Sequence, residues 1–505
     1  MLSTTLLLLA VSLQSPVQGI PKLFSETQTA APIPSIGIDE QASKSRLVTI
    51  DVELLSDTMN RTNHTGSFLL NFFDGDSVPV SFGKIETAYG DGWVWHGAVE
   101  GDQDSSALFS VTNGVVVGTV RYHDRLFRIN TAGNGLHRVS EVDEALFKPC
   151  GTNSSHEIHS TPSANSGGGS RNSGGNPDVD IMIVYTTKAM NNQGGINGMN
   201  SLINLAVTET NNGYNNSQVN QRLNLVHSEE MVGYTEPSSF STMLSNLRGK
   251  NDGKMDNVHT LRDQYGADVV SLFVNGSQYC GIAYLMTNVS HSFESNAFNV
   301  VSRSCATGYY STGHELGHNM GSAHDRANAG GASHSYAYGF RTSNNRYRTI
   351  MAYSPGTRVN RWSNPNITYG GYSMGVANSE ENWRSLNDNA SVVSGWRTNV
   401  PPAPVLVVPS LIAGWQAVLE VNNADPNDQI IIGYSVAGGG PTNTAWGQAD
   451  LSPPILNFPT ITANSSGIAT YAATPPPASK GMTVWLHAID ITSGLFTNSL
   501  SKTVL

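Results

Sequence analysis

Two histidines and a glutamate in one short segment have the spacing of a catalytic metal site. The segment reads His314-Glu315-Leu316-Gly317-His318. On a helix, residues four apart lie on the same face, so His314 and His318 can bind one ion together. Zn²⁺ suits neutral imidazole nitrogen, and a catalytic zinc site uses three protein ligands and one water. Glu315 would lie beside that water, where a carboxylate can act as a general base.

The residues that follow this segment can supply the third ligand. Gly321 can adopt a left-handed conformation that ends the helix, and His324 can then turn back toward the ion. One alternative is a set of three unconnected surface or core histidines. Another is a structural zinc site, but such a site is normally closed by a fourth protein ligand and has no use for Glu315. The pattern therefore predicts Zn²⁺ held by His314, His318 and His324.

This segment resembles the metzincin metalloproteases, whose motif HExxHxxGxxH is followed by a methionine turn. Thr349-Ile350-Met351-Ala352-Tyr353 would form that turn, with Met351 beneath the metal. Asp325, directly after the third histidine, is similar to the adamalysin/reprolysin branch. The resemblance covers residues 178–398 and implies an α/β catalytic domain with a mostly parallel sheet. It also implies that the protein cleaves peptide bonds of protein or peptide substrates with a zinc-activated water.

Tyr353 departs from that branch. It is similar to the tyrosine of astacins and serralysins, which can ligate zinc at rest and donates a hydrogen bond to the oxyanion during turnover. The alternative is an ordinary aromatic residue packed under the turn. The resemblance therefore adds Tyr353 to Glu315 as a candidate catalytic residue, and the subfamily stays open.

The chain has three cysteines, so an exported protein would leave one thiol unpaired. Pro149-Cys150-Gly151 resembles the cysteine switch of metzincin zymogens, in which a thiolate takes the coordination position meant for water. The alternative is a lone buried or intermolecular cysteine. If Cys150 is the switch, Cys280 and Cys305 remain as the natural disulfide pair.

The length of 505 residues suggests about three domains. Short alternating strands with glycine turns predict an all-β prodomain over residues 20–159, and a Gly/Ser-rich linker over 160–177 contains the expected processing site. Alternating strand and helix patterns predict the α/β catalytic domain over 178–398. They include strands at 179–185 and 267–274, a helical stretch at 239–265 and a last helix opened by Asn378. Residues 399–505, after a proline linker, predict a β-sandwich.

The N-terminus predicts export. Residues 6–13 are apolar but too few to span a bilayer, and small residues near position 19 suit cleavage of a signal peptide over 1–19. No later stretch reaches membrane length. The net charge of −11 and the lack of a Lys/Arg run argue against nucleic-acid binding. We expect a secreted protein without a membrane span, with a monomer favoured.

Three hypotheses fit these patterns. The first is a secreted zinc endopeptidase made as a latent zymogen. The second is a binding or adhesion protein in which the metalloprotease domain is inert and the C-terminal β domain carries the function. Glu315 favours the first, because an inert scaffold could lose its general base. The third, a zinc amidase acting on non-peptide amides, gains no support from the methionine turn or from Cys150.

Overall fold

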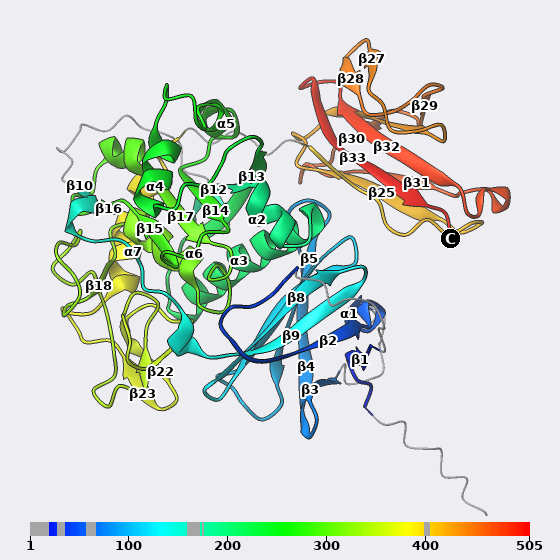
Figure 1. The fold of residues 1–505 in the computed structure, drawn as a ribbon. Coiled ribbons are helices and arrows are strands. Elements are labelled where there is room, and N and C mark those ends of the chain that lie inside the picture. The colour runs from blue at the N-terminus through cyan, green and yellow to red at the C-terminus, as the bar shows by residue number, and fades with distance from the viewer. Residues whose placement is uncertain (1–19, 28–35, 57–66, 159–171, 174–175, 398–403) are drawn as a thin grey trace, which may run out of the picture.

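The computed structural model describes residues 20–27, 36–56, 67–158, 172–173, 176–397 and 404–505. The predicted signal peptide over 1–19 and most of the predicted linker over 160–177 lie outside the described residues. The described residues form an N-terminal β domain, a central α/β domain and a C-terminal β domain, coloured blue to cyan, green to yellow and orange to red in Figure 1. This is the predicted fold class.

The N-terminal domain is one antiparallel sheet of nine strands in the order β1-β2-β9-β8-β7-β6-β5-β4-β3. Lys22 bridges to Leu69 of β3 near the other end of this order, which rolls the sheet into a barrel-like form. Aromatic side chains fill the inside, with Trp95 and Phe109 fully buried. The strands are β1 (Phe24–Glu26), β2 (Ala42–Ile50), β3 (Phe68–Phe73), β4 (Asp76–Thr87), β5 (Trp93–Val99), β6 (Ser106–Thr112), β7 (Val115–Tyr122), β8 (Arg125–Gly133) and β9 (Leu136–Val142), with helix α1 (Val52–Ser56) between β2 and β3.

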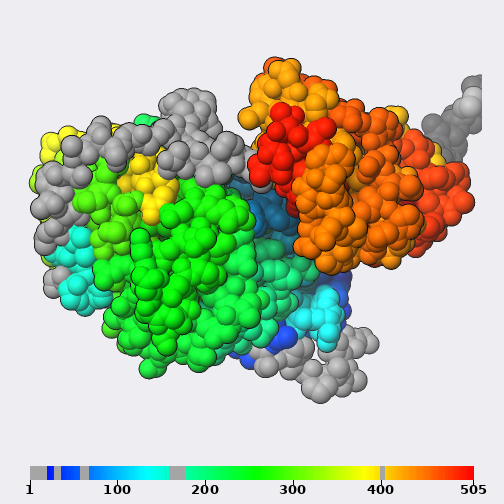
Figure 2. Space-filling model, turned by 90° about the horizontal axis from the view of Figure 1, so that it is seen from above, coloured from blue at the N-terminus to red at the C-terminus, as the bar shows by residue number. Residues whose placement is uncertain are grey.

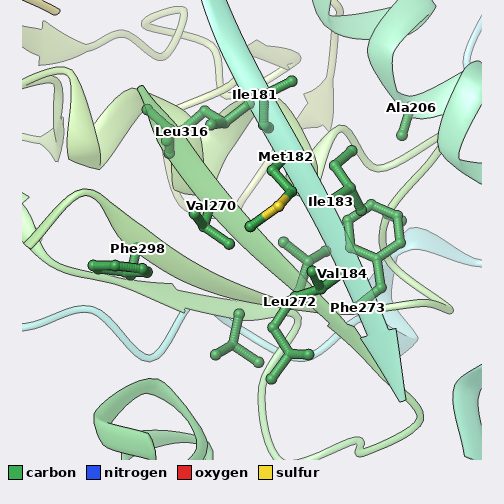
Figure 3. Close-up of a cluster of buried hydrophobic side chains, with 14 of the residues drawn as sticks. Ile181, Met182, Ile183, Val184, Ala206, Val270, Leu272, Phe273, Phe298 and Leu316 are labelled. Atoms are coloured by element: carbon green, nitrogen blue, oxygen red, sulfur yellow. The ribbon is translucent and has the colours of Figure 1, made fainter. Parts of the chain in front are cut away.

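The central domain is built on a mixed sheet. The strands β13 (Arg222–Met231), β12 (Asn176–Thr186), β14 (Val269–Val274) and β17 (Phe298–Ser302) are parallel, in that spatial order. The short β15 (Gly281–Ala283) closes one edge in the antiparallel direction. The two-residue β11 (Asn172–Ser173) pairs with the start of β12. Consecutive side chains of β12 pack on both faces of the sheet, as Figure 3 shows for Ile181 to Val184. A strand buried on both faces needs a continuous apolar run, which explains its sequence.

Six helices among the described residues belong to this domain: α2 (Thr187–Asn192), α3 (Ile196–Asn216), α4 (Phe240–Arg248), α5 (Asn257–Tyr265), α6 (Ser311–Asn319) and α7 (Asn382–Val393). Helix α6 packs against the edge of the sheet formed by β15 and β17. Short strand pairs surround the later segments: β18 (Ala323–Asp325) with β19 (Tyr338–Gly339), β20 (Tyr347–Arg348) with β21 (Thr357–Arg358), and β22 (Asn364–Tyr369) with β23 (Tyr372–Met374). None of the described helices is both long and apolar enough to cross a membrane.

Two boundaries differ from the sequence prediction. The stretch 239–265 is two helices, because Gly249 ends α4 and residues 249–256 form a turn with Gly253 at φ +71°. The last helix begins at Asn382, with Glu381 as its N-cap residue, and not at Asn378. Asn378 has φ 58° and lies in a turn between Val376 and Glu380, which form a bridge before the helix starts. The sequence also predicts that Trp383, Leu386, Ala390 and Val393 face inward; Leu386, Ala390 and Val393 are buried, and Trp383 is half-buried against the core.

The C-terminal domain has two main antiparallel sheets over its own core, the predicted sandwich. One contains β24 (Val405–Val407), β25 (Ala417–Asn422) and β31 (Ala469–Ala473). The other contains β29 (Leu456–Asn457), β26 (Gln429–Ser435), β32 (Thr483–Asp490) and β33 (Leu495–Thr503), and β30 (Ile461–Thr462) also pairs with β26. A small hairpin is formed by β27 (Thr442–Thr444) and β28 (Gly447–Ala449). Figure 2 shows this domain as a separate lobe beside the other two.

Candidate metal centre

Helix α6 positions the first two predicted ligands and the predicted base. His314, Glu315 and His318 are all buried in it. Gly317 allows the segment below to approach, because a Cβ there would lie 2.9 Å from the sulfur of Met351 and 2.8 Å from the ring of Trp362. Met351 therefore packs directly under the helix, as the methionine turn requires.

A turn after α6 brings the third histidine back. Gly321 has φ 93°, and Ser322 N donates to Gly317 O at 2.8 Å, so the helix ends there as predicted. His324 lies in β18. Its Nε2 atom is 3.1 Å from Nε2 of His314 and 3.0 Å from Nε2 of His318. The structure thus brings the three predicted ligands together.

The orientation of the rings fits a cation. Nδ1 of His314 donates to Ile350 O at 2.8 Å, and Nδ1 of His318 donates to Ser322 O at 2.9 Å, because a carbonyl can only accept. Their Nε2 atoms then carry lone pairs that face each other and His324. Burial lowers the pKa of all three imidazoles, to about 3 for His324, so they are neutral donors. Three converging lone pairs are stable only around a positive ion, and three neutral imidazoles suit zinc.

Cys150 supplies a fourth donor. Its sulfur lies 3.7 Å from Nε2 of His318, and the four ligand atoms all lie within 4.8 Å of one another. Tetrahedral zinc with ordinary bond lengths would place a sulfur and a nitrogen about 3.6 Å apart. Cys150 is held there by the edge strand, since Gly151 N donates to Gly281 O and Cys280 N donates to Pro149 O. The predicted thiol is therefore at the predicted site.

Glu315 lies under the same thiol. Its Oε2 accepts from Cys150 Sγ at 3.5 Å and from Thr152 Oγ1 at 3.4 Å, while Oε1 has no hydrogen-bond partner among the described residues. Burial raises the pKa of Glu315 to about 8. A Cβ on Gly281 would come within 2.5 Å of this carboxylate, so the edge strand passes Glu315 without a side chain. The carboxylate can hold a proton beside the metal position.

Tyr353 faces the site from the methionine turn. Its hydroxyl donates to the carbonyl oxygen of Cys150 at 2.9 Å, and its ring lies 4.3 Å from that of His324. Burial raises the pKa of this phenol far above its ordinary value, so the hydroxyl stays a donor. Asp325 fixes the turn, because its carboxylate accepts from Tyr353 N at 2.9 Å. In this structure Tyr353 therefore holds the segment that carries Cys150.

The disulfide prediction is confirmed. Cys280 and Cys305 are bonded, and Cys150 is the free cysteine. Sequence reasoning missed the charged groups that surround this segment, above all Arg348, Arg358 and Glu144. Glu144 lies 204 residues before Arg348, so no periodic signal connects it to the two arginines. Arg348 and Arg358 flank the methionine turn closely enough to have been considered.

A helix with two zinc-type histidines, a third histidine after a glycine turn, and a methionine turn beneath them define a metzincin-type zinc metallopeptidase. A family model described as Metallo-peptidase family M12, Reprolysin_5, matches residues 176–363. The chain is also 35% identical over 347 residues to a peptidyl-Asp metalloendopeptidase of Stenotrophomonas maltophilia, which covers 64% of this chain and 81% of that protein. The chain belongs to this M12 family of metallopeptidases.

Two further relatives are similar. A peptidyl-Asp metalloendopeptidase of Xanthomonas campestris is 34% identical over 343 residues, covering 64% of this chain and 80% of the relative. One of Pseudomonas fragi is 35% identical over 166 residues, covering 32% and 85%. Together with the histidine triad, the family makes this protein a zinc metalloendopeptidase. The matched range begins at residue 176, two residues before the catalytic boundary predicted at 178.

Proposed function

We propose that the protein is a secreted zinc endopeptidase, made as a latent zymogen and directed to bonds beside aspartate. The observation that carries the latency is the position of Cys150, whose sulfur lies among the three histidines and against Glu315. A thiolate is a strong zinc ligand, and a fourth protein ligand leaves no position for the reacting water. Removal of this one segment would open both the metal and the base.

Once the segment has left, this chain's residues have distinct roles. His314, His318 and His324 hold the zinc, which when bound polarises the scissile carbonyl and acidifies water. Glu315 accepts the proton from the attacking water and returns it to the leaving amine. The hydroxyl of Tyr353, freed from the carbonyl of Cys150, donates a hydrogen bond to the substrate carbonyl oxygen as negative charge develops there. The Tyr353 hydroxyl thus donates to a peptide carbonyl both in the precursor, where it is that of Cys150, and in the proposed active enzyme, where it is that of the substrate.

Two segments in the N-terminal half of the sequence support the proposed export and activation. The apolar segment at 6–13 supports secretion, and the Gly/Ser-rich stretch within 160–177 offers a cleavable connection after the thiol. N-terminal sequencing of the protein from culture medium tests both steps. We expect Ile20 as the first residue of the precursor and a residue within 160–177 as the first residue of the active form.

The preference for aspartate rests on the relatives, which are peptidyl-Asp metalloendopeptidases. The rival hypothesis, an inert scaffold acting through the C-terminal β domain, has less support. Glu315 is present, is buried within α6, and directs a carboxylate oxygen to the thiol at the metal site. A scaffold without catalysis has no need for that arrangement.

The decisive experiment compares precursors that differ at position 150. Full-length wild type, Cys150→Ser and Lys148→Ala are purified, and cleavage of casein is followed before and after limited proteolysis of the linker, with and without a zinc chelator. Cys150→Ser should be active before processing, whereas wild type and the exposed-residue control Lys148→Ala should be active only after it. Unprocessed Cys150→Ser that stays silent but becomes active after cleavage would contradict the switch. Processed enzyme without chelator-sensitive cleavage would contradict the protease function.

A further inference from the structure

Two arginines lie side by side next to the metal centre. Arg348 in β20 and Arg358 in β21 are directly paired in the parallel register of these strands, which flank the methionine turn. Both are almost fully buried, with exposed fractions of 1% and 4%. Arg348 donates to Ala352 O at 2.8 Å, two residues beyond the carbonyl of Ile350 that accepts from the zinc ligand His314. The strands that carry both arginines therefore lie next to the His314 side of the site, and the charge of Arg358 is close enough to act on His314 and Glu315.

These two positive charges are poorly compensated within the catalytic domain. The side chain of Arg358 donates to the carbonyl oxygen of Tyr309 at 3.1 Å, and its Nε has no hydrogen-bond partner among the described residues. Arg348 also donates to Gly356 O and to the hydroxyl of Tyr309. All of these partners are neutral. A pair of buried like charges needs an anion nearby, because desolvation and mutual repulsion both disfavour it.

The anion comes from the N-terminal domain. Glu144 accepts from the backbone N of Arg358 at 3.1 Å, and the same oxygen lies 3.9 Å from the guanidinium of Arg348. Its other oxygen lies 2.7 Å from Arg121, which belongs to the same N-terminal domain. Phe147 stacks on Tyr309 with 3.9 Å between ring centroids, so the segment from Glu144 to Cys150 covers the arginines and the metal ligands together.

Release of this segment removes Glu144 and Arg121 at once. Among the described residues, no other carboxylate then lies within ion-pair distance of Arg348, and the guanidinium of Arg358 has none in the precursor either. Arg341 also lies near the turn and donates to Ser354 O, but its carboxylate neighbour, Asp325 at 3.9 Å, belongs to the catalytic domain and stays. The arginine pair is therefore a cationic group that this release uncovers, and Glu144 marks a position beside it that a carboxylate can occupy.

Resting on the proposed function, we propose that Arg348 and Arg358 form the subsite that binds the acidic side chain of the substrate, and that Glu144 occupies this subsite in the precursor. The stacked ring of Tyr309 forms one wall of the subsite, since both guanidinium groups lie over it, at 5.3 Å and 4.0 Å from its centroid. In the precursor, one segment then places a thiol at the metal and a carboxylate in the specificity pocket, so Cys150→Ser alone should give the precursor only part of the activity of the processed enzyme.

The first test uses processed enzyme and two peptides that differ only as Asp or Asn beside the cleaved bond. Arg348→Gln and Arg358→Gln should lower kcat/KM for the Asp peptide at least 30-fold and change that for the Asn peptide less than threefold. The exposed neighbour Arg346→Gln should keep the wild-type selectivity. Variants that cleave the Asn peptide normally and still prefer Asp would overturn the proposal. If the processed wild-type enzyme cleaves neither peptide, the proposed function itself is overturned instead.

A second test needs no change to the enzyme, so it decides the matter even if an arginine variant does not fold. A synthetic peptide of residues 141–152 with Cys150→Ser, which cannot offer a thiolate, is used as an inhibitor of the processed wild-type enzyme. Adding Glu144→Gln to the peptide should raise its inhibition constant at least tenfold. Adding Asp143→Asn, a change at an exposed residue that only caps the turn at Ala145, should change it less than twofold. Equal inhibition by the Glu144 and Gln forms would overturn the proposal.

Discussion

The two β domains that flank the catalytic domain are alike in secondary structure and differ in how they are attached to it. The N-terminal sheet contributes Leu108 and Val117 to the hydrophobic core of the catalytic domain, whereas the described core of the C-terminal domain contains only its own residues. The N-terminal domain packs directly against α3 through β6 and β7. The C-terminal domain follows the catalytic domain after a proline-containing linker. Secondary structure alone therefore does not indicate what a β domain does for the catalytic domain. A shared hydrophobic core is the more informative feature.

Polar contacts sharpen this difference. Thr119 donates to Glu209 of α3 at 2.7 Å, and Arg121 donates to Tyr310 Oη at 3.1 Å and to Gly308 O at 3.2 Å, next to the start of the zinc-binding helix. The N-terminal domain is thus fitted to the catalytic domain from α3 to the metal. We therefore expect catalytic function to depend on the N-terminal and catalytic domains and not on the C-terminal domain.

The largest effect should come from the base that neither β domain can replace. Glu315→Gln removes the proton acceptor and should lower kcat/KM of the processed enzyme by about 10³-fold or more, while zinc content and folding stay unchanged. The measurement is peptide cleavage together with metal analysis. Activity within tenfold of wild type would show that Glu315 is not the general base of the cleavage.

The next effect concerns the disulfide, which lies where the N-terminal and catalytic domains meet. Cys280 and Cys305 share a small buried cluster with Phe147, and their bond closes a loop with a sequence separation of 25 residues. Replacing both cysteines by serine should lower the free energy of unfolding of the catalytic domain by about 3 kcal/mol. Hydrogen exchange, read peptide by peptide during denaturation, should show no change in the C-terminal domain. A matching loss there would break the proposed independence of that domain.

A smaller effect should appear in the pH dependence of N-terminal docking. Burial raises the pKa of Glu209 from 4.5 to about 7, against opposing hydrogen bonds from Thr119 and Gly308 and the charges of Arg121 and Arg128. The docked state therefore favours the protonated carboxyl. This contribution is fully present below about pH 4.5 and is lost as the pH rises through 7.

Inhibition by the N-terminal domain after the linker is cut should accordingly weaken at least tenfold between pH 5 and pH 7, beyond the change seen in Glu209→Gln. The measurement is the inhibition constant of the separated N-terminal domain, determined between pH 5 and pH 7 against the wild-type and the Glu209→Gln catalytic domains. The variant serves as the control, since every other titrating group is shared. Identical pH profiles would mean that Glu209 takes no part in docking.

The smallest effect should follow removal of the C-terminal domain. A chain that ends at Arg397 keeps α7 and all residues of the metal centre. We expect its kcat/KM on short peptides to stay within twofold of the full chain. A larger loss on short peptides would show that the domain supports the catalytic site directly, and the contrast between the two β domains would fail.

The local part of the site was predictable from the sequence. His314, Glu315 and His318 owe their common face to helical spacing, and the turn at Gly321 returns His324 within ten residues. Local spacing fixes such geometry because few backbone conformations satisfy it. The domain order and the single thiol could also be inferred, the latter because three cysteines leave one over.

The parts that the sequence could not reveal depend on contacts between distant segments. Glu144 meets Arg358 only because the sheet of the N-terminal domain docks on α3, and no pattern in the sequence specifies that docking. The start of α7 was misplaced because Asn378 and Glu381 match a capping box, while the surrounding turn, held by Arg326 through Ser379 and Glu380, delays the helix to Asn382. Tertiary contacts override a local preference of about 1 kcal/mol.

The shared core across α3 has a consequence for the timing of activation. Cutting the tether breaks one covalent connection but leaves Leu108 and Val117 inserted beside α3. Before the linker is cut, the N-terminal domain of the proposed zymogen is present at an effective concentration set by the linker, on the order of millimolar. After the cut it is present only at its bulk concentration. We therefore expect activation in two steps: cleavage of the linker permits release, and dissociation of the N-terminal domain on dilution makes the active site accessible.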